Sequence, residues 1–169
     1  MAIIGIVAID HNFAIGKDGK LPWHYSADMK FFKETTIGNT VVMGRRTWLT
    51  LKGRLKDRTN VVLSRDPEIT SNDSIIVMRD VDSVIELSKK QDAHLFVIGG
   101  AKVYEAFLPY IQRWVVTEVP QSVEGADTFM PANFLEGFEM YELRQLDGDL
   151  RVKFYERKPA SNSHPASAG

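Results

Sequence analysis

The stretch that decides how this chain is interpreted reads Ile15-Gly16-Lys17-Asp18-Gly19-Lys20-Leu21-Pro22-Trp23-His24-Tyr25-Ser26-Ala27-Asp28-Met29-Lys30-Phe31-Phe32-Lys33-Glu34-Thr35-Thr36. Its first nine residues are typical of a loop, because two glycines can adopt positive φ and a proline fixes the exit. The rest predicts a short helix with Ser26 as its N-cap. On that helix Asp28 and Phe32 are four residues apart, so they share one face.

Asp28 is the residue of this stretch that can carry chemistry. A carboxylate set among apolar side chains such as Met29 and Phe31 is costly unless something pairs with it. Without a partner its pKa rises, and it can then hold a proton near neutral pH. An acid in a first helical turn also complements the helix dipole at a protein surface. The stretch alone therefore leaves a purely structural role open.

The bulk composition is that of one ordinary globular domain. The chain has 169 residues, 21 Lys and Arg, 22 Asp and Glu, and no Cys, which gives no sign of a nucleic-acid or membrane partner and excludes disulfides and thiolate metal ligands. The four histidines are scattered without ligand spacing, so we expect no metal. The apolar run 3–9 is too short to span a bilayer. We expect a monomeric cytoplasmic protein with a single domain over 1–158 and a disordered tail over 159–169.

Short apolar runs alternate with helical patterns along the chain. The predicted strands cover 3–9, 40–43, 60–63, 74–77, 94–98 and 113–119, and the predicted helices cover 26–36, 45–51, 81–90 and 102–108. Such alternation is typical of an α/β fold. Near the end, two segments (139–146 and 150–157) flank Asp147-Gly148-Asp149, which is a hairpin signal. The prediction is a central, mostly parallel sheet with flanking helices and a C-terminal antiparallel hairpin.

Glycine turns and arginines follow the predicted strands. Ligands of open α/β sheets bind at the carboxyl ends of the strands. The residues at those ends are Gly44-Arg45-Arg46-Thr47, Ser64-Arg65, Met78-Arg79 and Gly99-Gly100-Ala101-Lys102. A glycine turn that leads into a helix can bind phosphate, although each turn alone is more often plain loop chemistry. The arginines favour a 2′-phosphorylated dinucleotide, NADPH, over NADH, with Asp66 as the nearest acid.

Taken together, these motifs resemble the dihydrofolate reductase family. The matching motifs are Ile15-Gly16, Leu21-Pro22-Trp23, Asp28 with Phe32, Val42-Met43-Gly44-Arg45 with Thr47-Trp48, Val97-Ile98-Gly99-Gly100-Ala101-Lys102-Val103-Tyr104, Thr117, and Gly125-Ala126-Asp127-Thr128-Phe129-Met130-Pro131. They occur in the family's order over about residues 2 to 157, and the set is far more specific than any single motif.

The resemblance implies a pterin site around Asp28. Asp28 would hold the pterin ring, with Thr117 beside it bridging through water, and Arg58 would hold the glutamate carboxylate of the substrate. The other implied substrate contacts are Ile6, Val7, Met29, Phe32, Lys33, Leu51, Leu55, Ile98 and Tyr104. The loop 51–58 lacks the prolines usual in the family, which leaves Arg54 as a rival to Arg58.

The resemblance also implies the cofactor contacts and a cis Gly99-Gly100 bond. The implied set is Ala8, Ile15, Gly16, Leu21, Gly44, Arg45, Arg46, Thr47, Leu63, Ser64, Arg65, Arg79, Gly99, Gly100, Ala101, Lys102, Val103, Tyr104 and Asp127. Residues 16–23 would form a gate over the nicotinamide. Leu21 would gate, and Trp23 would hold, a water that protonates pterin N5.

The implied activity is NADPH-dependent reduction of dihydrofolate to tetrahydrofolate, with Asp28 favouring the protonated substrate. Such an enzyme serves one-carbon metabolism and is an antifolate target. One alternative is the pyrimidine reductase of riboflavin synthesis, which would need neither Asp28 nor Arg58. Another is a non-catalytic dinucleotide-binding protein, which would keep the phosphate loops and lose the acid. Both alternatives are disfavoured because Asp28 and Arg58 are present.

Overall fold

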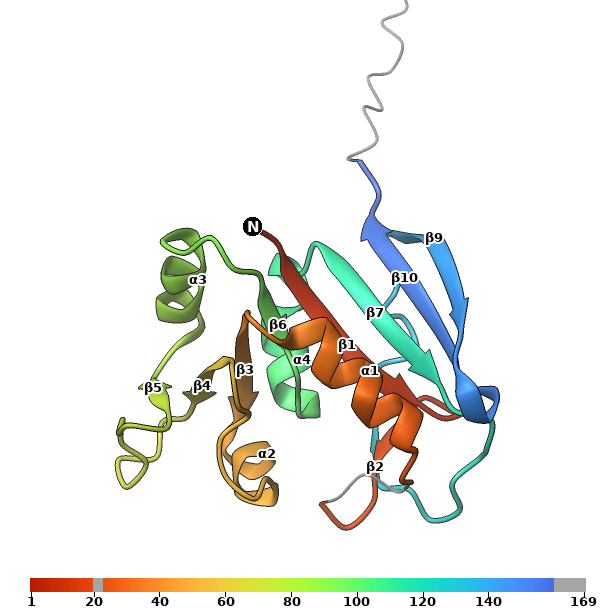
Figure 1. Cartoon of the computed structure of the whole chain (residues 1–169), viewed down its shortest axis with the longest axis horizontal. Coiled ribbons are helices and arrows are strands. Elements are labelled where there is room, and N and C mark those ends of the chain that lie inside the picture. Colours follow the sequence, from red (N-terminus) through yellow and green to blue (C-terminus); the bar gives the residue numbers. More distant parts are fainter. Residues whose placement is uncertain (20–22, 160–169) are drawn as a thin grey trace, which may run out of the picture.

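The computed structural model describes residues 1–19 and 23–159. Its centre is an eight-stranded sheet in the order β5-β4-β3-β6-β1-β7-β10-β9 (Figure 1). The strands are β1 (Ile3–Ile9), β3 (Thr40–Gly44), β4 (Thr59–Leu63), β5 (Ile76–Met78), β6 (Leu95–Val97), β7 (Arg113–Glu118), β9 (Phe138–Gln145) and β10 (Arg151–Arg157). Neighbours from β5 to β7 are parallel, and β7, β10 and β9 are antiparallel. The predicted mostly parallel sheet with an antiparallel C-terminal hairpin is confirmed.

Strand β1 lies inside the sheet because nearly every residue of it is apolar. It pairs with β6 on one side and with β7 on the other. Successive side chains alternate between the two faces. Ile6 joins the apolar cluster that includes Phe31, whereas Val7 joins the cluster that includes Val84 and Phe107. A strand buried on both faces needs an uninterrupted apolar run, and residues 3–9 supply it.

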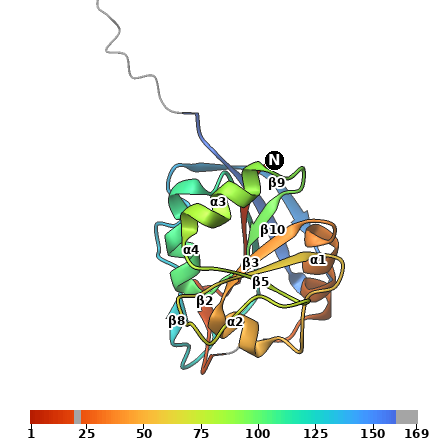
Figure 2. The ribbon, with the colours of Figure 1, turned by 90° about the vertical axis from the view of Figure 1, so that its left-hand side faces the viewer.

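Helices cover both faces of the sheet (Figure 2). Helix α1 (Ser26–Thr36) packs Phe31 against one face. Helices α3 (Val81–Lys89) and α4 (Ala101–Phe107) pack against the other face through Val84, Ile85 and Phe107. The short helix α2 (Arg45–Thr50) follows β3, and the 3-10 turn η1 (Leu108–Tyr110) follows α4. The helix that carries Asp28 therefore lies on the face opposite α3 and α4.

Two short strands were not predicted. Strands β2 (Ala14–Gly16) and β8 (Thr128–Phe129) form a separate antiparallel pair. Strand β2 has three residues and β8 has two, which is too few for the alternation of apolar and polar residues to show in the sequence. This small sheet joins the loop after β1 to the connection between β7 and β9.

Most predicted bounds shift by one residue at an end, and the start of α1, the start of β5 and the hairpin connection differ for a visible physical reason. Ser26 is the first residue of α1 rather than its cap; Tyr25 is the N-cap, in an extended conformation with φ −122°. Strand β5 starts at Ile76 instead of residue 74, because the Asn72 side chain accepts hydrogen bonds from the amides of Ser74 and Ile75 and holds a turn there. The Asp-Gly hairpin connection is the 3-10 turn η2 (Asp147–Asp149), with Gly148 at φ 79°.

The far end of the domain is tied to the body of the protein by backbone hydrogen bonds. The Lys158 amide donates to the carbonyl of Gly137 at 2.8 Å. Nearly all of the predicted tail, residues 160–169, lies outside the described residues. Among the described residues, no helix is both long enough and apolar enough to cross a membrane.

Candidate active site

Asp28 lies on α1 against the sheet, beside Thr117 of β7. Thr117 is buried, whereas Asp28 is partly buried. Burial raises the pKa of the Asp28 carboxyl above its ordinary value near 3.8, and the hydrogen-bonding Thr117 hydroxyl opposes part of that rise. The structure therefore brings together two residues that are far apart in the sequence and gives the carboxyl the upward pKa shift that its apolar surroundings predicted.

Apolar side chains gather on the same face of the sheet as Asp28. Phe32, Leu51, Leu55 and Ile98 all pack against the cluster that contains Ile6. They come from α1, from the segment after α2 and from the end of β6. Met29, which was predicted to belong to the same wall, is 57% exposed and does not pack against this cluster. Lys33 is also exposed. Phe32, Leu51 and Leu55 thus lie in one region of the molecule, on the sheet face that α1 covers.

Tyr104 links the two predicted ligand sites. It is buried, and its hydroxyl donates a hydrogen bond to the carbonyl of Ile6 at 2.7 Å. Burial and then the negative charge of Asp28 raise the pKa of this phenol. It therefore stays neutral and remains a donor. Because Tyr104 comes from the helix that follows Gly99-Gly100, the same helix serves the glycine turn and the β1 carbonyl.

Arg58 points toward α1. Its Nη1 donates to the hydroxyl of Thr36 at 3.1 Å, and its Nε donates to the carbonyl of Lys56 at 2.9 Å. Its guanidinium carbon is 6.0 Å from the centroid of the Phe32 ring, within the range of a cation–π contact. Arg54, the rival residue, is exposed. These contacts hold the Arg58 guanidinium beside Phe32 and Thr36, whereas Arg54 makes no hydrogen bond or ion pair among the described residues.

The two glycine turns lie side by side, as the sequence predicts. The Gly44 amide donates to the carbonyl of Gly99 at 2.9 Å, and the Gly99-Gly100 bond is cis. A Cβ at Gly100 would meet nothing closer than the Thr47 hydroxyl at 3.9 Å, whereas one at Gly44 would press on Val103 at 3.0 Å. Open space beside Gly100 lets a phosphate approach the backbone. The residues therefore fit the pyrophosphate of a dinucleotide.

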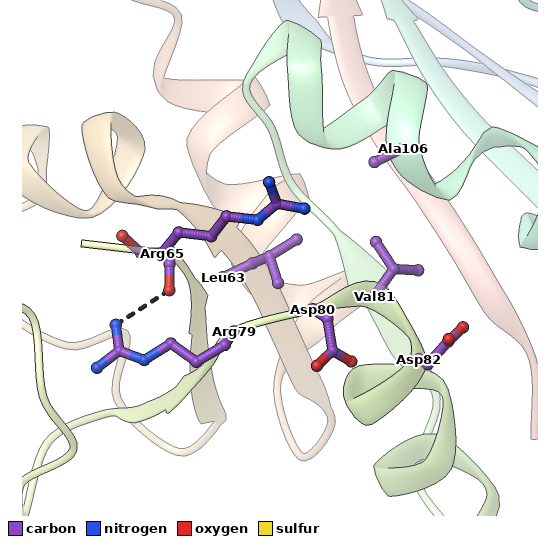
Figure 3. Close-up of a pocket in the computed structure, with 8 residues that line it drawn as sticks. Leu63, Arg65, Arg79, Asp80, Val81, Asp82 and Ala106 are labelled. Carbon is purple, nitrogen blue, oxygen red and sulfur yellow. Dashed lines mark hydrogen bonds between the residues drawn. The ribbon is translucent and has the colours of Figure 1, made fainter. Parts of the chain in front are cut away.

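A cavity of about 390 Å³ lies next to these turns, with Arg65 along one wall and Asp80 and Asp82 along another (Figure 3). Leu63, Ser64 and Arg79 also line it. Arg79 is already committed: its guanidinium donates to the carbonyls of Ser64, Asp66 and Ile69 at 3.0, 2.6 and 2.7 Å. Arg79 therefore forms part of the cavity wall. Arg65 is exposed and lines the same cavity.

Asp66 and Asp80 have structural roles that sequence reasoning missed. Asp66 forms an ion pair with Arg45, with 3.2 Å between the carboxylate and Nε. Asp80 caps α3 by accepting from the Ser83 amide at 2.7 Å, and this bond contributes most to holding the pKa of Asp80 below its usual range. Asp80 directly before the helical pattern of 81–90 was a readable N-cap signal.

The predicted gate over the nicotinamide is only partly described. Leu21 lies outside the described residues, so its predicted role is not addressed by the structure. Trp23 buries its indole Nε1, which has no hydrogen-bond partner among the described residues. Asp127 accepts from the Asp18 amide at 2.8 Å, so its carboxylate holds the first part of the predicted gate, just after β2. Ala8 and Ile15 are partly buried, and Gly16 is buried.

Comparison with known proteins agrees with this geometry. A family model described as dihydrofolate reductase matches residues 2–156, which include Asp28, Arg58, Thr117 and both glycine turns. The chain belongs to the dihydrofolate reductase family.

Curated dihydrofolate reductases share about a third of their residues with this chain. The enzyme of Haemophilus influenzae is 33% identical over 148 residues, covering 86% of this chain and 90% of its own. The enzyme of Lactococcus lactis is 33% identical over 164 residues, covering 92% and 97%. A solved dihydrofolate reductase from Enterococcus faecalis, complexed with NADP(H) and RAB-propyl, has a TM-score of 0.85 and 31% identity, covering 94% of this chain and 97% of its own.

The structure brings Asp28, Thr117, Tyr104 and the glycine pair to one side of the β1 carboxyl end. Groups of three or more His, Asp or Glu that could hold a metal do not occur among residues 1–19 and 23–159.

Proposed function

We propose that the chain catalyses NADPH-dependent reduction of 7,8-dihydrofolate to 5,6,7,8-tetrahydrofolate, with hydride transfer to pterin C6 and a proton to N5. Membership of the dihydrofolate reductase family supports the activity. The observation that carries the residue-level proposal is a partly buried carboxylate, Asp28, beside Thr117 and below an apolar wall. This site adjoins two glycine turns, of which the second leaves space for a phosphate beside Gly100.

Asp28 has the properties needed to hold a protonated pterin. NADPH supplies the hydride when bound. A carboxylate that is partly out of water favours a cationic ring next to it more strongly than the same group in solvent would. Two carboxylate oxygens can also accept two parallel N–H bonds from the ring, which fixes its orientation. Thr117 holds Asp28 in place, and the buried Trp23 Nε1 is a free donor among the described residues for a water near the reacting edge.

Arg58 and Arg65 provide specificity at the two ends of the site. The contacts of Arg58 with Phe32 and Thr36 direct its guanidinium group toward the place where the glutamate carboxylate of the substrate would lie. A planar guanidinium suits a carboxylate because two N–H bonds form in parallel. Arg65 lines the cavity beside Ser64 and favours a ribose 2′-phosphate. Arg79, the other arginine of this cavity, is bound to three backbone carbonyls, which leaves Arg65 to meet the phosphate.

The functional unit we propose is the single domain of residues 1–158, acting as a cytoplasmic monomer on small molecules. The near-zero net charge, −1, supports the small-molecule part of this proposal, because it offers no electrostatic attraction to nucleic acid or to an anionic membrane.

The test of the proposal is the loss of reduced-nicotinamide absorbance when dihydrofolate is added to the protein with NADPH. We expect rapid loss with the natural chain and a drop in kcat/KM of roughly 100- to 10,000-fold for Asp28→Asn at neutral pH. Asp92→Asn is the matched control, since it removes one exposed carboxylate far from the site, and it should leave the rate unchanged. No absorbance loss with the natural chain would refute the activity. An unchanged rate for Asp28→Asn, with NADPH binding intact, would remove Asp28 from the mechanism.

A further inference from the structure

Asp10 is a buried acid that the proposed chemistry does not use. It directly follows β1 and is 3% exposed. One carboxylate oxygen accepts from the amides of Asn12 and Ala14, both at 2.8 Å. The other oxygen accepts from the amide of Val123 at 2.7 Å. All three partners are backbone groups, so Asp10 shapes the path of the chain.

The three bonds join two segments that are remote in the sequence. Asn12 belongs to the turn that leads from β1 into β2 and Ala14 is the first residue of β2, whereas Val123 belongs to the connection from β7 to β8. The backbone adds one bond between the same segments, from the His11 amide to the Gln121 carbonyl at 3.0 Å. Asp10 therefore links the start of β2 to the connection that leads into β8, the strand with which β2 pairs.

Both segments continue into the small sheet. Beyond Asp10, the Met130 amide donates to the Phe13 carbonyl at 2.8 Å, and the Asp127 amide donates to the Gly16 carbonyl at 3.1 Å. Between these two bonds lies Ile15, which together with Gly16 is the proposed contact of the nicotinamide amide. The position of these two residues thus depends on how β2 and β8 meet.

The three amides that donate to Asp10 require an ionised carboxylate, because both of its oxygens must accept hydrogen bonds. Burial alone would favour the protonated acid, but the hydrogen bonds from Val123, Ala14 and Asn12 and the charge of His11 hold the pKa of Asp10 below its ordinary value of 3.8. A carboxylate offers acceptors on both oxygens. An amide offers one acceptor and one donor, so Asn in this place would direct an N–H at another N–H.

We propose that Asp10 is a positioning residue that sets the backbone of β2, and through it Ile15 and Gly16, for the nicotinamide end of NADPH. The inference rests on the proposed function, because the nicotinamide contact is part of that function. It makes a specific claim about the cofactor: the nicotinamide half depends on Asp10, and the adenosine half, held at Gly44, Arg65 and Gly99-Gly100, does not.

The experiment compares two ligands on the full chain. NADPH reaches both halves of the cofactor site, whereas 2′,5′-ADP carries only the adenosine half with its 2′-phosphate. For Asp10→Asn we expect the dissociation constant of NADPH to rise roughly tenfold, and that of 2′,5′-ADP to stay within about twofold of the natural chain. Asn39→Ala is the control for general destabilisation. It removes a side chain that accepts from the His94 amide at 2.9 Å at the opposite end of the strands, and it should lower the melting temperature without changing the ratio of the two constants.

An Asp10→Asn protein with an unchanged ratio of the two dissociation constants would overturn the inference. If Asp10→Asn does not fold, Asp10→Ser is measured in the same way, since its hydroxyl can serve the Asn12 amide but not the distant Val123 amide. Failure of both variants to fold would make Asp10 a folding residue and would also overturn the positioning role. A natural chain that binds NADPH but does not reduce dihydrofolate would refute the proposed function and leave the ratio test for Asp10 intact.

Discussion

At the scale of single residues, Asp28 is held in an environment that its charge does not favour. Its pKa is raised by burial, and the hydrogen bond from Thr117 compensates only in part. Ionised Asp28 therefore lowers the free energy of unfolding of the ligand-free protein. A cationic ligand that binds beside the carboxylate offsets this loss. Strain of this kind is expected where function, rather than stability, selects the residue.

This account predicts that Asp28→Asn stabilises the free protein at neutral pH. A folded-state pKa above the unfolded value means that stability is fully present below about pH 3.8 and is lost as pH rises through the folded pKa. Asn cannot ionise and avoids that loss. The variant should melt higher at pH 7, by about 2–4 °C for each 1 kcal/mol gained, and the gap should close near pH 3. Thermal melts over that range measure it, and an equal or lower melting temperature at pH 7 would contradict the burial argument.

Residues differ in how far the sequence could predict them. Asp28 and the two glycine turns stand in recognisable local patterns, so their places in the fold were predictable. Arg79 also follows a strand, but its guanidinium is bound to three carbonyls, and only the folded path of 64–69 reveals that. Asp10 depends on an amide 113 positions away in the sequence. Nothing in its local sequence indicates that partner.

At the scale of elements, β1 and β7 pack together at Gly5 and Trp114, which are paired across the two strands. Trp114 is fully buried, and its ring lies where a Cβ on Gly5 would be. The same ring packs edge-on against Phe134 at 5.1 Å and next to Tyr104 at 5.7 Å. A glycine in the middle of a strand is normally unfavourable, and here it is required because another side chain occupies the space.

We predict that Gly5→Ala destabilises the protein by about 1–3 kcal/mol, because overpacking forces a buried ring or a strand to shift. Trp114→Leu in the same chain should recover part of that loss, since the smaller side chain makes room for the methyl group. Denaturant unfolding of both single variants and the double variant gives the coupling energy. Simple additivity of the two changes would show that Gly5 and Trp114 do not share this space.

Elements were predictable where the residue pattern is long enough to show a period. The apolar run of β1 and the helical pattern of α3 both appear within one or two residues of the predicted bounds. Strands β2 and β8 are too short for that, and they are set by pairing with each other and by the bonds around Asp10 and Asp127. Ser26 was predicted as a cap from its residue type, yet the chain enters α1 one residue earlier, at Tyr25.

At the scale of the whole molecule, the sheet order brings the parts of the site together. Strands β3, β6, β1 and β7 are consecutive neighbours in space. Their carboxyl ends deliver Gly44, Gly99-Gly100 and Thr117 to one edge. Helix α1 on one face adds Asp28, and α4 on the other adds Tyr104. The class of fold followed from the alternation of strands and helices, but the strand order did not, since pairing depends on tertiary contacts.

The central claim is that this site passes hydride from the nicotinamide to pterin C6. The most direct measurement uses NADPH carrying deuterium at both C4 positions, with dihydrofolate, and locates the deuterium in the product by NMR. We predict one deuterium at C6 of tetrahydrofolate and a solvent-derived proton at N5. Deuterium at C7, or a product in which C6 takes its hydrogen from solvent, would contradict the account.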